Sequence, residues 1–397
     1  MKNKLPFSLI LCLVGYPQIS ETIYTPALVS LARGLGVTPH AAELTLSFYF
    51  LGFAAGVFCW GMAADRLGRR PSMLLGIFVY ILGCIACASA PNIWILLAAR
   101  FMQAFGASTG SVITQTMLRD SLEGTERQKF FALIGAALSL SPAIGPLAGG
   151  VIADLFDWRA CLWVLSLFGT LLFFWSVFKL PETQKTGAAY TPLVKVAKRM
   201  GGDKELWQSV LYVGILNGIA FSFYSEAPFV FIETFGFSAA AYGLIGLVIA
   251  AAGLTANLFN RWSAGRWSQE KLLKRSAALL IISSSALFLL GGSALGYALL
   301  SGALFFSIGL MIPTLLSGAL KNYPECLGTA GALFGMAYYL LISLSTAGMS
   351  FLHNGSIGMF PLYVLMLTLL SISSRFFSTL RRMKRPFSKA AAVKAER

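Results

Sequence analysis

Charged residues and histidines are scarce in this 397-residue sequence. Asp, Glu, Lys and Arg together make up 12% of the chain, against about 25% in a soluble domain. So few charges cannot cover a soluble surface, and we expect lipid to be the solvent for much of the chain. The two histidines, His40 and His353, fall in predicted outer connections between apolar segments. They are therefore expected to form neither a metal cluster nor a catalytic triad.

Motifs for nucleotide, redox and metal chemistry are lacking as well. The sequence has no Walker A loop, so ATP is not expected to be the energy source. Cys84 and Cys87 form a C-x-x-C, but it lies inside an apolar segment, where we interpret both as small packing residues. We therefore predict no enzyme, no cofactor and no metal site.

Long apolar runs take up most of the sequence. Hydrophobic residues make up 57% of it, and a membrane-spanning helix needs about 20 of them in succession. The runs do not alternate apolar and polar residues as the strands of a membrane barrel would. The N-terminal run has no small-residue cleavage site and is interpreted as an uncleaved first helix. The predicted fold is all-α, with twelve transmembrane helices at about 7–32, 41–63, 72–90, 94–118, 130–153, 159–180, 206–232, 240–262, 272–291, 296–320, 327–351 and 357–380.

Basic residues gather on one side of this predicted topology. If both termini are cytoplasmic, all but three of the 31 Lys and Arg residues lie inside, the exceptions being Arg33, Arg159 and, within a span, Arg100. This bias is the positive-inside rule. The net charge of +15 is therefore assigned to topology and to attraction for anionic membrane lipids, not to nucleic acid. We predict a multi-pass protein of a bacterial inner membrane, acting as a monomer.

A longer charged connection divides the spans six and six. The predicted parts are an N-terminal half (1–183), a cytoplasmic linker (184–205), a C-terminal half (206–380) and a basic cytoplasmic tail (381–397). Paired six-helix halves with a midplane substrate site are a common transporter plan. Weak internal symmetry supports it, because Ser20-Glu21 and Ser225-Glu226 recur at matching places in the first helix of each half.

Several motifs resemble the major facilitator superfamily. The run Gly61-Met62-Ala63-Ala64-Asp65-Arg66-Leu67-Gly68-Arg69-Arg70 resembles motif A of that superfamily, and Arg100 to Gly106 is similar to its motif B. Gly145-Pro146-Leu147-Ala148-Gly149-Gly150 is similar to the end of motif C, the signature of its antiporters, although Ser141 stands where the pattern has Gly. Further stretches are similar to the Bcr/CflA-like drug/proton antiporters: Ile23 to Leu28, Asp157 to Arg159, and Ala227 to Val230. The loop from Arg261 to Arg275 lacks the Asp of a second motif A.

The resemblance implies two sets of residues that take part in the conformational change. An acid and several arginines in a tight turn can pair in one conformer and separate in the other, which makes a switch if the pair is stronger in one state. The predicted latch comprises Asp65, Arg66, Gly68, Arg69 and Arg70. Glycines and a proline let a helix bend and approach its neighbour closely. The predicted helix-bending antiporter motif comprises Gly145, Pro146, Gly149 and Gly150.

Isolated polar groups at membrane depth mark the predicted coupling and substrate site. Arg100 is expensive there, so we expect it to face the protein interior, on a stripe with Gln103; the alternative is that it extends to the head groups. Glu21 is expected to take up and release a proton, because low dielectric favours its neutral form. Glu226 could do the same or lie among the head groups. Tyr24, Asn217 and Tyr338 complete the predicted site.

One departure from the family pattern bears on Glu21. In the Bcr/CflA-like proteins the acid of this helix often stands one residue later, where this sequence has Thr22. A shift of one residue turns a helical side chain by about 100°. Glu21 could then point at a neighbouring helix instead of the centre.

These observations predict a secondary transporter that works by alternating access. We expect proton-coupled efflux, by antiport, of amphipathic small molecules or drugs. The alternatives are a dedicated exporter of one metabolite such as a siderophore, and a nutrient importer. A membrane-embedded enzyme and a nontransporting receptor are the alternatives from other classes.

Overall fold

A helix occupies each of the twelve predicted spans. The computed structural model describes residues 6–122, 141–184, 193–323 and 326–373, with 124, 126, 130 and 135. The basic tail (381–397), the middle of the predicted linker (185–192) and much of the first part of the span 130–153 lie outside the described residues. Within them, eight helices are long and apolar enough to cross a membrane, and the helices over Ala143–Leu155 and Met359–Ser371 are shorter apolar ones.

The N-terminal half begins with a broken helix. Pro26 cannot donate a backbone hydrogen bond, and the first predicted span is accordingly divided near it into α1, a 3₁₀ turn and α2. The described elements of this half are α1 (Phe7–Thr22), η1 (Thr25–Ala27), α2 (Leu28–Leu35), α3 (Pro39–Leu67), α4 (Arg69–Ala88), α5 (Ile93–Ser121), α7 (Ser141–Leu155) and α8 (Trp158–Lys179).

The C-terminal half follows a short connecting helix. Its first long helix contains Pro228 and continues as a π-helical turn, η2, a form often found at functional sites. The described elements are α9 (Leu193–Gly201), α10 (Lys204–Pro228), η2 (Phe229–Thr234), α11 (Ala239–Gly243), α12 (Ile245–Ser263), α13 (Gln269–Leu290), α14 (Ala294–Ala319), α15 (Leu327–Leu352) and α16 (Met359–Ser373).

Short polar side chains fix where the helices begin. An Asn, Asp, Ser or Thr just before a helix can accept a hydrogen bond from one of its free backbone amides. Thr38, Asn92, Asp157 and Ser293 do so at the starts of α3, α5, α8 and α14. The turns between spans therefore follow directly from the local sequence.

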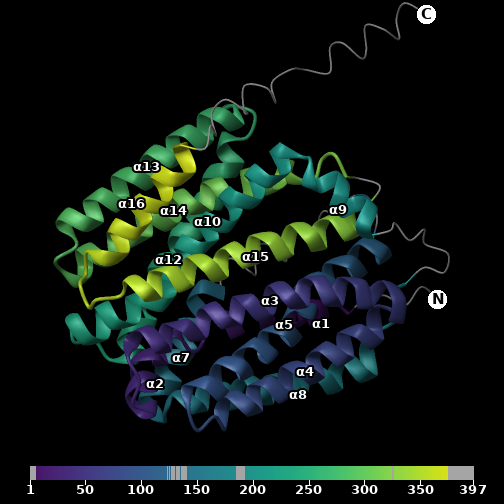
Figure 1. Cartoon of the computed structure of the whole chain (residues 1–397), viewed down its shortest axis with the longest axis horizontal. Coiled ribbons are helices and arrows are strands. Elements are labelled where there is room, and N and C mark those ends of the chain that lie inside the picture. Colours follow the sequence, from purple (N-terminus) through teal and green to yellow (C-terminus); the bar gives the residue numbers. More distant parts are fainter. Residues whose placement is uncertain are drawn as a thin grey trace, which may run out of the picture.

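The two halves lie side by side, with α3 and α15 along the boundary between them (Figure 1). We call the end of the bundle with Leu67, Lys179 and Gln269 the basic end. The opposite end, with Leu35, Leu155 and Leu352, is the distal end. Large apolar side chains such as Phe178 and Leu289 are exposed on the outside of the bundle, as expected for a surface that faces lipid.

The boundary between the halves is closely packed. The Ser343 hydroxyl donates to the Ser47 carbonyl oxygen at 2.8 Å. The rings of Phe53 and Tyr339 lie 4.4 Å apart, and a Cβ at Gly61 would be 3.2 Å from the Ala332 side chain. Helix α3 therefore contacts α15 over much of its length.

Polar contacts close the distal end of this boundary. The Asp154 carboxylate accepts hydrogen bonds from the backbone amides of Ala239 and Ala240, at 3.0 and 2.9 Å, and so caps α11 of the other half. Arg33 and Glu233 form an exposed ion pair at 3.3 Å. In the described conformation, these contacts therefore join the two halves at the distal end.

Candidate functional site

A cavity of about 130 Å³ lies between the halves. It receives polar groups from α1 and α10, and aromatic groups from α10 and α15. Its lining residues are Gln18, Glu21, Val213, Asn217, Phe221, Ile312, Leu316, Tyr338, Tyr339 and Ile342. Such a mixture of apolar walls and a few converging polar groups is typical of small-molecule sites.

Glu21 is the acid in this lining. Its side chain is buried, and its Oε1 atom has no hydrogen-bond partner. Its neighbour Thr22 points elsewhere, because a Cβ at Gly145 of α7 would lie 1.9 Å from the Thr22 hydroxyl. Position 21 therefore faces the cavity and position 22 packs against α7, so the shift from the family pattern keeps the acid at the centre.

Arg100 is buried inside the N-terminal half. Its guanidinium lies 3.8 Å from the centre of the Tyr24 ring and 4.4 Å from that of Tyr49, and it donates a hydrogen bond to the Gln103 side-chain oxygen. Only 1% of Arg100 is exposed, so the alternative in which it reaches the head groups is wrong. Stacking on two aromatic faces and a charge-assisted hydrogen bond compensate for its burial.

Gln103 links this arginine to the C-x-x-C of α4. Its side-chain nitrogen donates to the Cys84 sulfur at 3.0 Å, and the Cys87 thiol lies 3.7 Å from its oxygen. Both cysteines are free and buried. The two thiols thus complete a polar contact between α4 and α5 and pack there, in keeping with the non-redox interpretation.

The remaining predicted site residues lie in different places. Asn217 and Tyr338 line the cavity, and the Asn217 side chain also donates to the carbonyl oxygen of Val213 at 2.8 Å. Tyr24 does not line the cavity but covers Arg100. Arg100 and Gln103 therefore support the wall behind Glu21 without reaching the cavity surface.

Glu226 belongs to a separate cluster at the distal end. It is buried, contrary to the head-group alternative, and the His353 Nδ1 atom lies 2.8 Å from one of its oxygens. The same Nδ1 atom lies 3.1 Å from Glu43 of α3. From the sequence, neither a metal cluster nor a triad was expected at the histidines, and the structure places His353 beside two acids. Glu43 was not predicted at all, although an acid inside an apolar span was a usable signal.

The glycines of α7 lie against two other helices. A Cβ at Gly149 would be 1.6 Å from the Ile23 carbonyl oxygen, and one at Gly150 would be 2.3 Å from the Ala239 carbonyl oxygen. Pro146 lies inside the helix, and its carbonyl oxygen is 2.6 Å from where a Gly243 Cβ would stand. Helix α7 therefore fits between α1 and α11 of the other half because these positions lack side chains.

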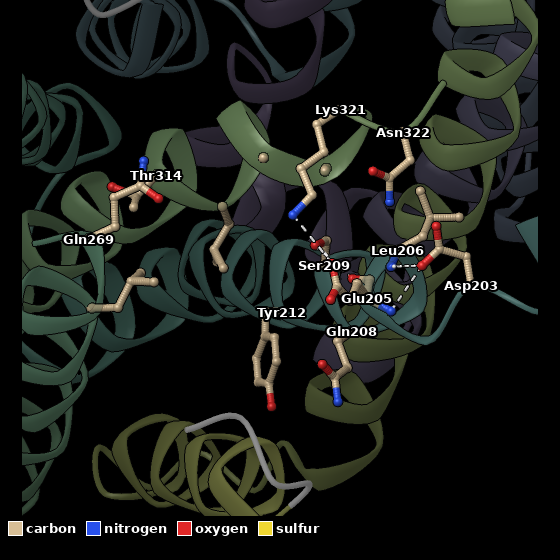
Figure 2. Close-up of a pocket in the computed structure, with 14 residues that line it drawn as sticks. Asp203, Glu205, Leu206, Gln208, Ser209, Tyr212, Gln269, Thr314, Lys321 and Asn322 are labelled. Atoms are coloured by element: carbon tan, nitrogen blue, oxygen red, sulfur yellow. Dashed lines mark hydrogen bonds and ion pairs between the residues drawn. The ribbon is translucent and has the colours of Figure 1, made fainter. Parts of the chain in front are cut away.

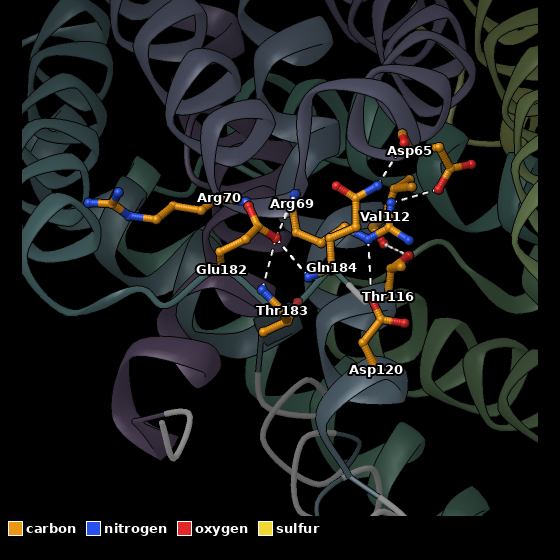
Figure 3. Close-up of polar contacts among 9 residues, drawn as sticks. All are labelled: Asp65, Arg69, Arg70, Val112, Thr116, Asp120, Glu182, Thr183 and Gln184. Atoms are coloured by element: carbon orange, nitrogen blue, oxygen red, sulfur yellow. Dashed lines mark hydrogen bonds and ion pairs between the residues drawn. The ribbon is translucent and has the colours of Figure 1, made fainter. Parts of the chain in front are cut away.

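The predicted latch forms an ion-pair network at the basic end (Figure 3). Arg69 pairs with Asp65 at 2.6 Å and with Asp120 of α5 at 3.1 Å. Arg70 donates to the Val177 carbonyl oxygen of α8 at 2.8 Å, and Arg66 is exposed. The turn between α3 and α4 is thus tied to two further helices of its own half.

Glu182 completes this network, and its role there was not predicted from the sequence. Its carboxylate accepts backbone hydrogen bonds from Arg69 and Arg70 at the start of α4, and from Thr183 and Gln184 (Figure 3). Partial burial opposes its charge, but these four donors outweigh that effect and lower the pKa of Glu182. Gly68, with φ of +101°, places its missing Cβ 2.7 Å from the same carboxylate, so glycine suits this turn on both counts.

The fold and these motifs agree with the comparison to known families. Residues 11–346 match the family described as Major Facilitator Superfamily. This chain belongs to that superfamily. It is 33% identical over 392 residues to an "Uncharacterized transporter" of Rickettsia bellii, covering 94% of this chain and 96% of the relative. It is also 28% identical over 344 residues to "Multidrug resistance protein D" of Escherichia coli, covering 82% and 84%.

Solved structures show the same major facilitator fold. A D-xylose-proton symporter superimposes with a TM-score of 0.72 at 15% identity, over 92% of this chain and 96% of the other. A POT family transporter in complex with a thioalcohol conjugated peptide gives 0.73 at 13% identity, over 92% and 94%. Together with the match to the superfamily and to the relatives above, this fold makes the chain a membrane transporter and not an enzyme.

This major facilitator has a second, smaller cavity at the basic end of its C-terminal half (Figure 2). It measures about 50 Å³, and Asp203, Glu205, Tyr212 and Lys321 are among its lining residues. Lys321 pairs with Glu205 at 3.3 Å, and Asp203 caps α10. These four side chains already have partners within the protein, and the cavity lies within one half. The cavity that contains Glu21, which lies between the halves, is therefore the better candidate for a substrate site.

Proposed function

We propose that this transporter exports cationic amphipathic small molecules in exchange for protons. The observation that carries the proposal is Glu21, a buried carboxyl group with an unpartnered oxygen in a cavity between the halves. A proton and a substrate cation would compete for this carboxylate. Occupancy by one lowers the affinity for the other, and this coupling is reciprocal.

The surroundings of Glu21 favour a cation with an apolar body. Phe221, Tyr338 and Tyr339 supply aromatic faces to the cavity, and such faces attract cations. The one buried arginine of this region, Arg100, is occupied by two tyrosine rings and Gln103. It is not among the lining residues, which disfavours an anionic substrate such as a ferric siderophore.

The relatives support efflux. Multidrug resistance protein D of Escherichia coli and, at 24% identity, multidrug resistance protein MdtL of Escherichia fergusonii are similar to this chain over most of its length. Both are named for multidrug resistance, which export of drugs would produce. We transfer this activity to the present chain as part of the proposal.

The proton gradient supplies enough energy for such export. One charge that crosses about 100 mV releases about 2.3 kcal/mol, and about 1.4 kcal/mol supports each tenfold concentration gradient. We place the transporter in a bacterial inner membrane, with the basic end and both termini in the cytoplasm. The halves 1–183 and 206–380 would then rock about the cavity, and the distal contacts between them would break as that end opens.

Transport of ethidium and tetraphenylphosphonium by the full chain in proteoliposomes tests the proposal. We expect uptake against a gradient only when a proton gradient of the right sense is imposed. Glu21→Gln should lose at least tenfold in proton-driven transport and should bind the cation with an affinity that no longer changes with pH. Glu205→Gln, which removes an acid that pairs with Lys321 inside the C-terminal half, should behave like the unmodified protein.

Equal transport with and without the proton gradient would reject proton coupling. An unchanged pH dependence of cation binding in Glu21→Gln would make Glu21 a structural residue. A substrate panel that gave transport of anions alone would favour the dedicated exporter.

A further inference from the structure

Three ionisable side chains from both halves meet at the distal end of the boundary. Glu43 comes from α3, Glu226 from α10, and His353 follows directly after α15. The two glutamates are 0% and 1% exposed. The potential ligand atoms of the three residues lie within 4.8 Å of one another. This cluster lies outside the cavity and has no part in the function proposed above.

The charges in the cluster are not balanced by the protein. The single His353 Nδ1 atom approaches an oxygen of Glu226 at 2.8 Å and one of Glu43 at 3.1 Å. The other oxygen of each carboxylate, Oε2 of Glu43 and Oε1 of Glu226, is buried without a hydrogen-bond partner. When both carboxyl groups are ionised, the cluster carries a net negative charge in either protonation state of the histidine. A buried group of this kind needs a further positive charge, which either a proton on one carboxyl group or a bound metal ion can supply.

We propose that Glu43, Glu226 and His353 form a binding site for a divalent transition-metal ion, with Zn²⁺ as the reference ion. Zinc binds imidazole nitrogen and carboxylate oxygen at about 2.0–2.2 Å, which places neighbouring ligand atoms about 3–3.5 Å apart. The separations of 2.8 and 3.1 Å already come close to this spacing. The metal would take the place of the proton on Nδ1, which is released, and its two charges would neutralise both carboxylates.

The ligand set favours a transition metal over calcium or magnesium. Calcium and magnesium prefer oxygen ligands, whereas imidazole suits zinc and its neighbours. Three protein ligands leave at least one coordination position for water. The exposed residues Asn354 and Gly355 follow His353 directly, so the site lies one residue from the distal surface.

A metal ion bound here would hold the halves together. Glu43 belongs to the N-terminal half, and the other two ligands belong to the C-terminal half. Outward opening of the transporter would pull these ligands apart. A ligand that binds one conformer better shifts the population toward it, so Zn²⁺ should stabilise the distal-closed state and inhibit turnover.

Metal binding to the purified full-length protein tests the site. Titrations with Zn²⁺, and with Co²⁺ followed by its visible absorption, are made in a Cys59→Ser background, because Cys59 is an exposed thiol. We expect one ion per chain and a rise in Tm with Zn²⁺. Glu43→Gln and His353→Ala should each weaken binding at least tenfold. Glu233→Gln, an acid at the same end outside the cluster, should bind as before.

Folding controls and the inhibition of transport by Zn²⁺ test the proposal further. Size-exclusion profiles and Tm without metal establish that each variant is folded, and Glu43→Gln, which keeps the shape of the side chain, serves if His353→Ala does not fold. Zn²⁺ should inhibit transport by the unmodified protein and act at least tenfold more weakly on Glu43→Gln. Absence of binding, or equal binding by the folded cluster variants, would show that the cluster holds protons alone and would overturn the metal site.

Discussion

Arg100 and Glu21 are two charged residues of opposite sign that the N-terminal half buries in different ways. Arg100 is enclosed by Tyr24, Tyr49 and Gln103, whereas Glu21 opens onto the cavity. The cost of a buried charge is met for the arginine by rings and a hydrogen bond. The Glu21 carboxyl group has the positive charge of Arg100 nearby but no hydrogen bond to its Oε1 atom, so a proton or a cation that enters the cavity would supply the remaining compensation. Because of this difference, we propose Arg100 as a supporting residue and Glu21 as the coupling residue.

Replacement of Arg100 tests the supporting role. We expect Arg100→Ala to lower transport at least tenfold and to destabilise the protein by about 2–4 kcal/mol, since it leaves Gln103 and two tyrosine faces without their partner. Arg100→Lys keeps the charge but loses the planar stacking. Its transport rate and its stability should therefore lie between those of the unmodified protein and those of Arg100→Ala. Transport rates and thermal unfolding of both purified variants are the measurements. Full activity of Arg100→Ala would contradict this role.

At the scale of elements, helix α7 fits between α1 and α11 because its glycines lack side chains. Gly149→Leu would place atoms on the Ile23 carbonyl oxygen, so we expect loss of transport and a much lower Tm. Gly253→Leu in α12 is the matched control, because nothing lies within 4 Å of its Cβ position. Equal behaviour of the two variants would argue against close packing of α7 in the working protein.

The α3–α4 turn depends on a carboxylate from the end of the half. Because the pKa of Glu182 lies below its ordinary value of 4.5, folding favours the charged form. That contribution is complete above about pH 4.5 and is lost as the pH falls through the lowered pKa. Glu182→Gln should therefore lower Tm at about pH 7, and the difference from the unmodified protein should shrink at about pH 3.5. A difference that does not change with pH would assign the effect to packing.

The Asp65 contact offers a second test of the same turn. Asp65→Asn removes the charge opposite Arg69, and we expect transport to fall several-fold while expression stays close to normal. Unchanged transport by the purified variant would leave this turn with a purely topological role.

At the scale of the whole molecule, the halves meet along α3 and α15 and are joined by polar contacts at the distal end. The basic residues predict the orientation in the membrane, and labelling from outside the cell tests it. Lys195→Cys, on the exposed face of α9, should resist an impermeant thiol reagent applied to intact cells. Gly292→Cys, in the distal turn before α14, should react. The two are compared in a background without native cysteines, and labelling of Lys195→Cys alone would reverse the topology.

The sequence by itself determined the fold of this protein. Helix number and bounds follow from apolar runs that each span a bilayer and from caps such as Thr38 and Asn92, which act within a few residues of themselves. Membership of the superfamily could be predicted in the same way, because the motif from Gly61 to Arg70 is one continuous stretch of sequence. Helical spacing also predicted that Arg100 lies in the interior, since exposure of a charged side chain to lipid at that depth is costly.

Only the tertiary structure decided which distant groups meet. Helical spacing gives the face of a residue relative to its own helix, not the partner that this face will meet. The direction of Glu21 was therefore open until Thr22 was seen to pack on Gly145. Glu182 reaches the α4 amides across 113 positions of sequence. Glu43, Glu226 and His353 lie in three separate spans or turns, and packing of the two halves alone brings them together.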